Sequence, residues 1–184
     1  VLMGEEEPLR AFDHHWFANL LGAPVVSATV ADGEPWPVAQ LSGLSGVPGG
    51  QDVSPQLSWS DVPEGTKSFA VTCFDPDAPT GSGFWHWAAF NIPVEVSELP
   101  TNAGAAEDLG IDGVISLRND SGERTYYGAN PPAGHAPHRY LYAVHAVDVE
   151  KLDIDPDATP TVLGFNLHFH ALGRAILWGW YEAK

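Results

Sequence analysis

The chain has little cysteine, little basic charge and no long apolar run. Its single cysteine, Cys73, excludes an internal disulfide bond. Eight Lys and Arg residues against 24 Asp and Glu residues give a formal net charge of −16. Nucleic acids and anionic membrane surfaces both select basic proteins, so this charge argues against them as partners. No segment has the apolar length of a membrane span or of a signal-peptide core. We therefore expect a cytoplasmic protein without stable membrane insertion.

The length and the distribution of turn residues indicate one main domain. Among 184 residues there are 16 prolines and 19 glycines, spread along the chain, which is typical of turn-rich β structure. We assign residues 1–22 to an N-terminal extension and 23–184 to a single domain. Within the extension, residues 8–21 predict an amphipathic helix. Its apolar face would pack on the domain or, alternatively, meet a second copy in a homodimer.

The pattern of apolar residues predicts mostly short strands. Runs bounded by turn residues predict strands at 25–30, 56–59, 68–75, 84–92, 114–117, 125–128, 139–149 and 178–181. Helical spacing predicts one helix at 161–177. Many strands with a helix near the end favour a mainly β fold, an antiparallel β-sandwich with peripheral helices.

Two carboxylates and a histidine lie close together in the middle of the chain. Asp75 and Asp77 belong to the segment Asp-Pro-Asp-Ala-Pro-Thr at 75–80. If that segment is extended, both side chains point to the same face. His86 follows on the next predicted strand, and its neighbours Trp85 and Trp87 should fill the core on the opposite face. The same segment could also be a simple surface turn.

A second polar cluster opens the longest predicted strand. His138 and Tyr140 should point to one face and Arg139 to the other. The loop at 130–134 (Asn-Pro-Pro-Ala-Gly) precedes this strand and supplies backbone amides that could approach a ligand. His138 and Tyr140 could therefore face the group around Asp75.

The two motifs together resemble the phosphatidylethanolamine-binding protein family, also called Raf-kinase-inhibitor-like proteins. The resemblance is carried by 75–86 and by 131–140, and it covers roughly residues 25–182. The ending, with Leu-Gly-Phe at 163–165 and Gly-Trp-Tyr-Glu at 179–182, is similar to the bacterial branch. The resemblance implies a small pocket for phosphate-like anions or phosphorylated headgroups, without a cofactor. It also implies modulation of a kinase or protease partner.

The resemblance further implies which residues bind the ligand. The pocket would be lined by Asp75, Asp77, Pro79, His86, His138 and Tyr140. Its rim would be formed by Asn130 and Pro131, and the family more often has glycine or cysteine at the position of Asn130.

Phosphate binding beside two carboxylates requires compensating donors. We expect His86 and His138 to be protonated, with nearby acids raising their pKa values. Tyr140 would add a hydroxyl donor, and Arg139 could neutralise a buried acid. On this interpretation, anion affinity falls as pH rises through the histidine titration.

Other functions fit the same residues. Two histidines and a carboxylate could bind Fe(II) or Zn(II), although no tight ligand spacing is present. The same inventory could serve a small acid–base enzyme, such as an isomerase, cyclase or hydrolase. No covalent nucleophile is evident, because Cys73 lies within a predicted strand. We interpret His145 as structural and His168 and His170 as facing solvent or a partner.

Overall fold

The computed structural model describes residues 25–184, so the predicted N-terminal helix at 8–21 lies outside the described residues. Its centre is a five-stranded sheet in the order β5-β3-β2-β6-β7, and every strand pairing in it is antiparallel. Its strands are β2 (Ser68–Asp75), β3 (Phe84–Pro93), β5 (Ile115–Ser116), β6 (His138–Val147) and β7 (Ala171–Tyr181). A second, antiparallel two-stranded sheet pairs β1 (Leu57–Ser58) with β4 (Glu98–Leu99).

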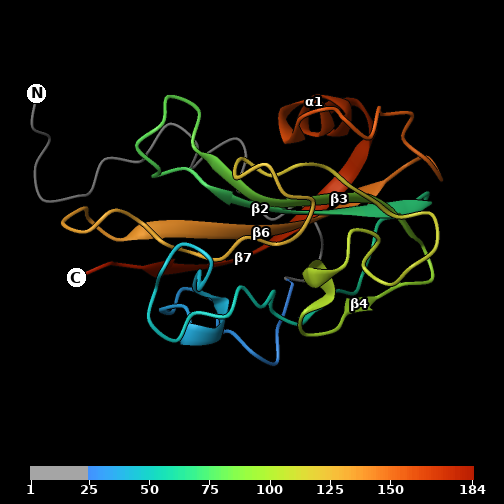
Figure 1. Cartoon of the computed structure of the whole chain (residues 1–184). Coiled ribbons are helices and arrows are strands. Elements are labelled where there is room, and N and C mark those ends of the chain that lie inside the picture. The colour runs from blue at the N-terminus through green and yellow to red at the C-terminus, as the bar shows by residue number, and fades with distance from the viewer. Residues whose placement is uncertain (1–24) are drawn as a thin grey trace, which may run out of the picture.

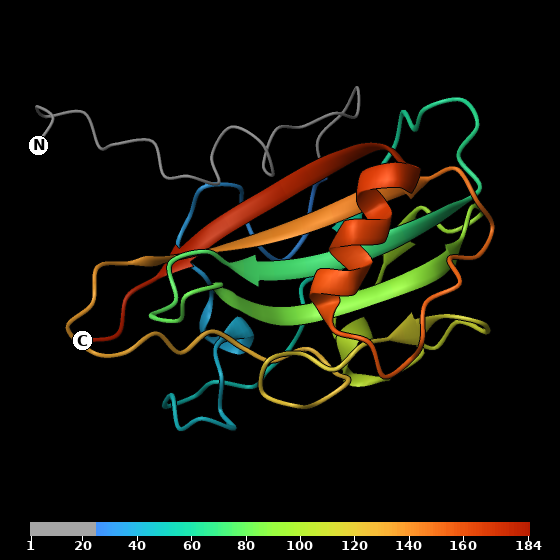
Figure 2. The same ribbon diagram turned by 90° about the horizontal axis from the view of Figure 1, so that it is seen from above.

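The central sheet is covered on both faces. The helix α1 (Pro160–His170) crosses one face, while β4 and long loops lie on the other (Figures 1 and 2). Two short 3₁₀ helices, η1 (Val38–Gln40) and η2 (Ala103–Ala105), belong to those loops. The larger core cluster joins the sheet to Leu57 and Leu99, and a smaller one lies under Leu163 and Leu167 of α1. The predicted mainly β, antiparallel architecture with few helices is confirmed.

The last helix is shorter than the sequence predicted. We expected a helix at 161–177, but α1 ends at His170 and β7 follows at once. Residues 171–177 contain good helix formers, yet they pair with β6, and tertiary pairing outweighs weak local propensity. The expected strand at 25–30 reduces to one bridge between Val26 and Ser58. No strand forms at 125–128.

An extra residue in β3 changes which side chains face the larger core. Cys73 pairs with Trp87, while the next residue of β2, Phe74, pairs with Trp85. His86 is therefore the additional residue of a β-bulge. Trp85 packs against Phe74, whereas Trp87 joins the larger core with Cys73. The expectation that both tryptophans lie opposite His86 is wrong for Trp87, because the bulge interrupts the alternation.

A second bulge in β3 is built on a left-handed residue. Phe69 pairs with Ile92 and Val71 with Ala89, which leaves one extra residue in β3. Asn91 has φ of 63° in this stretch and is buried. Its Oδ1 accepts a hydrogen bond of 2.8 Å from the backbone N–H of Leu152. Asparagine suits the position because it tolerates the left-handed conformation and supplies that acceptor.

We predict that Asn91→Ala destabilises the fold more than Asn91→Gly. Alanine loses the bond to Leu152 and is strained at positive φ, so the free energy of unfolding should fall by about 2–3 kcal/mol. Glycine loses only the bond, for about 1 kcal/mol. Urea unfolding of the two variants and the parent checks this. Equal stability of the two variants would show that the backbone there is unstrained.

Candidate functional site

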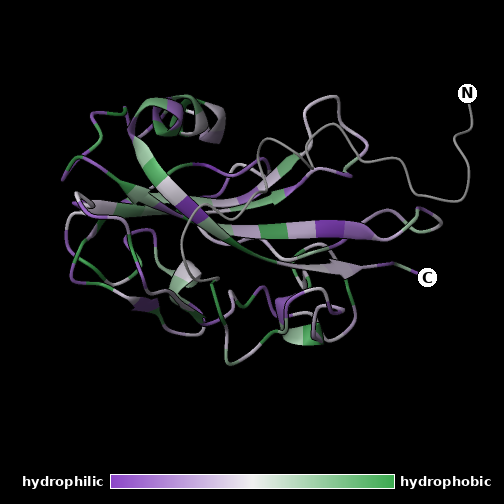
Figure 3. Cartoon of the chain, turned by 180° about the vertical axis from the view of Figure 1, so that it is seen from behind, coloured by the Kyte–Doolittle hydropathy of each residue, from purple (hydrophilic) through white to green (hydrophobic). Residues whose placement is uncertain are grey.

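The end of β2 and the beginning of β6 form a buried polar pair. Figure 3 shows the strongly hydrophilic start of β6, followed by more hydrophobic residues. There, Nδ1 of His138 lies 2.8 Å from Oδ2 of Asp75, and both side chains are buried. Burial raises the pKa of Asp75, and the bond from His138 opposes that rise. Oδ1 of Asp75 accepts the backbone N–H of Asp77 at 2.8 Å.

Asp77 is held by Arg139 and does not continue the strand of Asp75. β2 ends at Asp75 and the chain turns, so the expected alternation to a shared strand face does not apply. Oδ2 of Asp77 accepts the backbone N–H and the Nε–H of Arg139, each at 2.9 Å. Oδ1 accepts Nη2 of Arg139 at 3.2 Å. Arg139 thus neutralises an acid, as expected, and that acid is Asp77.

His86 is buried and bonded to a backbone carbonyl. Its Nδ1 lies 2.7 Å from the carbonyl oxygen of Tyr127, and its ring meets that of Tyr140 edge-on, with centroids 5.2 Å apart. Burial lowers the pKa of His86 to about 4, against smaller opposing effects of backbone bonding and Asp52. The expectation that neighbouring acids raise this pKa is wrong, because desolvation outweighs them.

Tyr140 carries a hydroxyl that the fold does not use. The residue is 1% exposed, and its hydroxyl has no hydrogen-bond partner among residues 25–184. Burial and the nearby charge of Asp75 raise its pKa, so the hydroxyl stays protonated. A buried donor without a partner is uncommon and marks a place where a ligand or water could bond.

The structure thus brings four of the expected residues together: Asp75, His86, His138 and Tyr140. We call these four the polar cluster.

Of the other four expected residues, Asp77 is bonded to Arg139 as described above, and three lie outside the polar cluster. Pro79 is exposed in the turn between β2 and β3, and Asn130 is exposed with its Nδ2 bonded to the carbonyl of Ser45 at 3.2 Å. Pro131 is buried. Within the described part of the chain, no hydrogen bond, ion pair or ring contact joins these three residues to His86 or His138. Their role as lining and rim stays a prediction.

Two contacts of the site escaped sequence reasoning. His135 is exposed, and its Nδ1 lies 3.4 Å from Nε2 of His138. His135 precedes His138 by only three residues, which suggests that the two are close. The sequence does not show, however, where the side chain of a loop residue points. Tyr127 contributes a backbone carbonyl, which any residue could supply, and a ring that stacks on that of His86 with centroids 6.1 Å apart.

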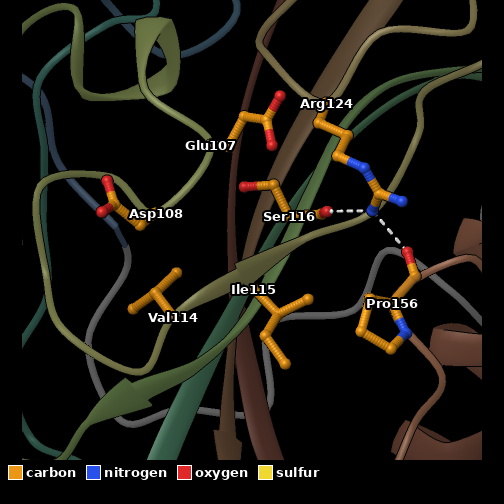
Figure 4. Close-up of a pocket in the computed structure, with 7 residues that line it drawn as sticks. All are labelled: Glu107, Asp108, Val114, Ile115, Ser116, Arg124 and Pro156. Atoms are coloured by element: carbon orange, nitrogen blue, oxygen red, sulfur yellow. Dashed lines mark hydrogen bonds between the residues drawn. The ribbon is translucent and has the colours of Figure 1, made fainter.

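A separate hollow lies beside β5 (Figure 4). Its volume is about 480 Å³, and it contains none of the residues of the polar cluster. Nη1 of Arg124 crosses it to the carbonyl of Ser116 at 2.9 Å and to that of Pro156. The hollow is lined by Glu107, Asp108, Val114, Ile115, Ser116, Arg124 and Pro156. Arg124 also pairs with Asp157, so its guanidinium ties β5 to a neighbouring loop.

The described residues offer no metal centre. In residues 25–184, no group of three or more His, Cys, Asp or Glu side chains is arranged to hold a metal ion. In the same range, no helix has the length and apolar character needed to cross a membrane. His145 is buried near Thr72, in keeping with a structural role, and burial lowers its pKa to about 3. Nδ1 of His170 pairs with Asp148 at 2.8 Å.

Comparison with known proteins identifies the relationship. The family model described as phosphatidylethanolamine-binding protein matches residues 26–182. The chain belongs to the phosphatidylethanolamine-binding protein family. It is 46% identical over 151 residues to the UPF0098 protein YbhB of Escherichia coli, covering 82% of this chain and 94% of that protein. It is 42% identical over 161 residues to YbcL of the same organism, covering 87% of each.

Solved structures of the phosphatidylethanolamine-binding protein family share this fold. The crystal structure of Escherichia coli YbcL superposes with a TM-score of 0.82 at 41% identity, covering 88% of this chain and 98% of that one. That structure is described as a new member of the mammalian family. A homologue from Chlamydia trachomatis superposes with a TM-score of 0.71 at 28% identity, covering 88% and 97%. The chain is thus a bacterial-type member of the family.

We predict that acid destabilises this protein partly through its buried histidines. His86 and His145 are neutral when folded, with pKa values of about 4 and 3, but regain the ordinary value of 6.5 when unfolded. Their contribution to the free energy of unfolding is therefore complete above pH 6.5, and it is lost as the pH falls toward 4. From pH 7 to 4.5, each should lower the free energy of unfolding by about 2 kcal/mol.

The variant His145→Gln tests this prediction, and His168→Gln, which changes an exposed histidine, is its control. Urea unfolding at pH 7 and 4.5 should show a smaller acid loss in His145→Gln, by about 2 kcal/mol, because the glutamine does not titrate. Identical losses in the two variants would contradict the proposed titration.

Proposed function

We propose that this protein binds a small phosphate-like anion or phosphorylated headgroup at the polar cluster. The observation that carries the proposal is the hydroxyl of Tyr140, which is buried and without a partner among residues 25–184, on a ring that contacts the imidazole of His86. Fold stability gains nothing from such a donor, because a buried unpaired hydroxyl is unfavourable by about 1–3 kcal/mol. A ligand oxygen would complete it.

The charges around the cluster are consistent with an anionic ligand. Asp75 faces His138, and Asp77 is paired with Arg139, so neither carboxylate meets the ligand uncompensated. When His138 is doubly protonated, it donates Nδ1–H to Asp75 and offers Nε2–H outward. Membership of the family supports ligand binding in general, and its name supports a phosphorylated headgroup.

Modulation of a kinase or protease belongs to the same proposal but rests on the family alone. Partner surfaces lie outside the polar cluster, and the same fold can carry unrelated partners. We likewise propose that the protein acts in the cytoplasm, which agrees with a chain whose single cysteine allows no internal disulfide bond.

An acid–base enzyme is a second candidate, favoured by the state of His86. Its neutral ring keeps one nitrogen as a proton acceptor close to Tyr140, which is the inventory of a general base. An isomerase, cyclase or hydrolase of this kind would lose turnover in His86→Gln while still binding its ligand.

The substitution Tyr140→Phe tests anion binding with Tyr126→Phe as its matched control. In Tyr126, the buried hydroxyl donates to the carbonyl of Gln40 at 3.0 Å. We expect Tyr140→Phe to weaken the binding of phosphoethanolamine and inorganic phosphate by about 10–100-fold, the worth of a hydrogen bond to a charged group. Its free energy of unfolding should stay equal or rise. Tyr126→Phe should lose about 1 kcal/mol of stability with unchanged affinity.

Calorimetric titration and urea unfolding of both variants measure these effects. Unchanged anion affinity in Tyr140→Phe would remove the hydroxyl from the site. Absence of binding by the parent protein to either anion would refute the proposed function.

A further inference from the structure

One face of the central sheet is covered by α1 at only one of its ends. There, α1 lies over a core that contains Phe90 and Val147 (Figure 2). At the other end of the same face, Leu141 and Ala143 of β6 form a separate small cluster with Ile176 of β7. We call these three residues the outer patch. Among residues 25–184, α1 is the only α-helix, so the outer patch has no helix of its own.

The outer patch is nevertheless buried. Leu141 is 6% exposed and Ala143 is 8% exposed. By contrast, Phe165 and Phe169 on the outer side of α1 are 66% and 64% exposed. A sheet face buries apolar side chains only where another layer covers it. The outer patch therefore requires a cover other than α1.

The sequence before Val25 contains an apolar stripe of matching character. Residues 8–21, which lie outside the described residues, are predicted to form an amphipathic helix. The apolar residues of its stripe recur at three- and four-residue spacing and are Leu9, Phe12, Trp16, Phe17, Leu20 and Leu21. Ala11 and Ala18 fall on the opposite side of such a helix. A short helix of this kind depends on packing of its apolar side for its stability.

The attachment of this segment keeps it near the sheet. Residues 22–24 join it to Val25, which is buried in the larger core. Three residues span at most about 10 Å. Further along, the N–H of Gly33 donates to the carbonyl of Trp178 at 2.8 Å, so the chain after Val25 reaches the outer edge of β7, the strand that carries Ile176. A tethered segment has an effective concentration on the order of mM, whereas a second copy with the same net charge of −16 is repelled.

One acidic residue within the stripe selects between the possible surfaces. Asp13 lies four residues after Leu9 and therefore falls on the apolar side of the predicted helix. Burying a carboxylate is unfavourable unless a cation pairs with it. α1 contains no Lys or Arg. Arg174 lies two residues before Ile176 in β7, so its side chain belongs to the same sheet face as the outer patch.

We propose that residues 8–21 pack their apolar stripe on the outer patch of the same chain, and that Asp13 pairs with Arg174. Arg139 lies on this face too, but its guanidinium holds Asp77, so Arg174 is the cation assigned to Asp13. The proposal is independent of anion binding, because the outer patch lies on the opposite side of β6 from Tyr140.

Paramagnetic broadening of NMR signals in the full chain tests this placement. Cys73 is buried, so Ala18→Cys supplies a single accessible thiol for a nitroxide label, on the side of the predicted helix away from the stripe. The oxidised label should remove the amide signals of Leu141 and Ala143, and reduction of the label should restore them. The same label on Ala105→Cys, an exposed position in η2 on the other face of the sheet, should leave these signals intact.

A mixed sample separates the same chain from a second copy. When ¹⁵N-labelled parent is mixed with unlabelled, nitroxide-bearing chain, the signals of the outer patch should not be broadened. Broadening in that mixture would assign the cover to a second copy and overturn the proposal. Within one chain, stronger loss of the signals of Phe165 and Phe169 than of Leu141 would place the segment on α1 and overturn it. Absence of broadening at the outer patch would overturn it as well.

Exchanging the charges tests the pairing of Asp13 with Arg174. In the nitroxide-bearing chain, Asp13→Arg should restore the lost signals, because two cations then meet in a poorly solvated place. Adding Arg174→Asp should remove the signals again, since the pair re-forms with opposite signs. Ala11→Arg, on the opposite side of the predicted helix, is the matched control and should change nothing. Broadening that survives Asp13→Arg would overturn the pairing, and this result does not depend on whether Arg174→Asp folds.

Discussion

The pairing of β6 with both of its neighbours is the constraint on which the rest of the structure depends. β6 pairs with β7 from His138 to Val147 on one side and with β2 from Leu141 to Val147 on the other. Because register in a sheet fixes which face each side chain meets, this double pairing holds His138 and Tyr140 on the side of the larger core. It also brings the start of β6 to the end of β2, where Asp75 lies. A slip by one residue would exchange Tyr140 for Arg139 at that face.

The bulge in β3 completes the arrangement from the third strand. Without the extra residue, His86 and Trp87 would face opposite sides of the sheet. With it, Trp87 fills the larger core while His86 reaches the ring of Tyr140. One inserted residue therefore allows a large apolar side chain and a polar one to serve neighbouring regions of the same face. Bulges of this kind commonly re-aim a side chain beside a functional site.

The polar cluster was predictable from sequence where strand alternation and the family motif agreed, as for Asp75, His86, His138 and Tyr140. Sequence reasoning failed where the structure departs from regular alternation or from local propensity. Asp77 lies just past the end of β2, Trp87 follows a bulge, and β7 replaces the second half of an expected helix. The neutral state of His86 depends on its burial and on a backbone carbonyl, and neither can be read from residue types.

The polar cluster also shows a conflict between stability and binding. A fold optimised only for stability would not bury the hydroxyl of Tyr140 without a partner, nor desolvate the ring of His86. The nearby carboxylates of Asp75 and Asp77 differ from these two groups, because each is paired with a cationic or ionisable side chain. Within the polar cluster and its neighbour Asp77, the carboxylates that would repel an anion are compensated, while the hydroxyl of Tyr140 is not. Five other buried polar atoms among residues 25–184 also lack a partner, so the support for the proposed binding site is the position of the Tyr140 hydroxyl in the polar cluster, and not the missing partner alone.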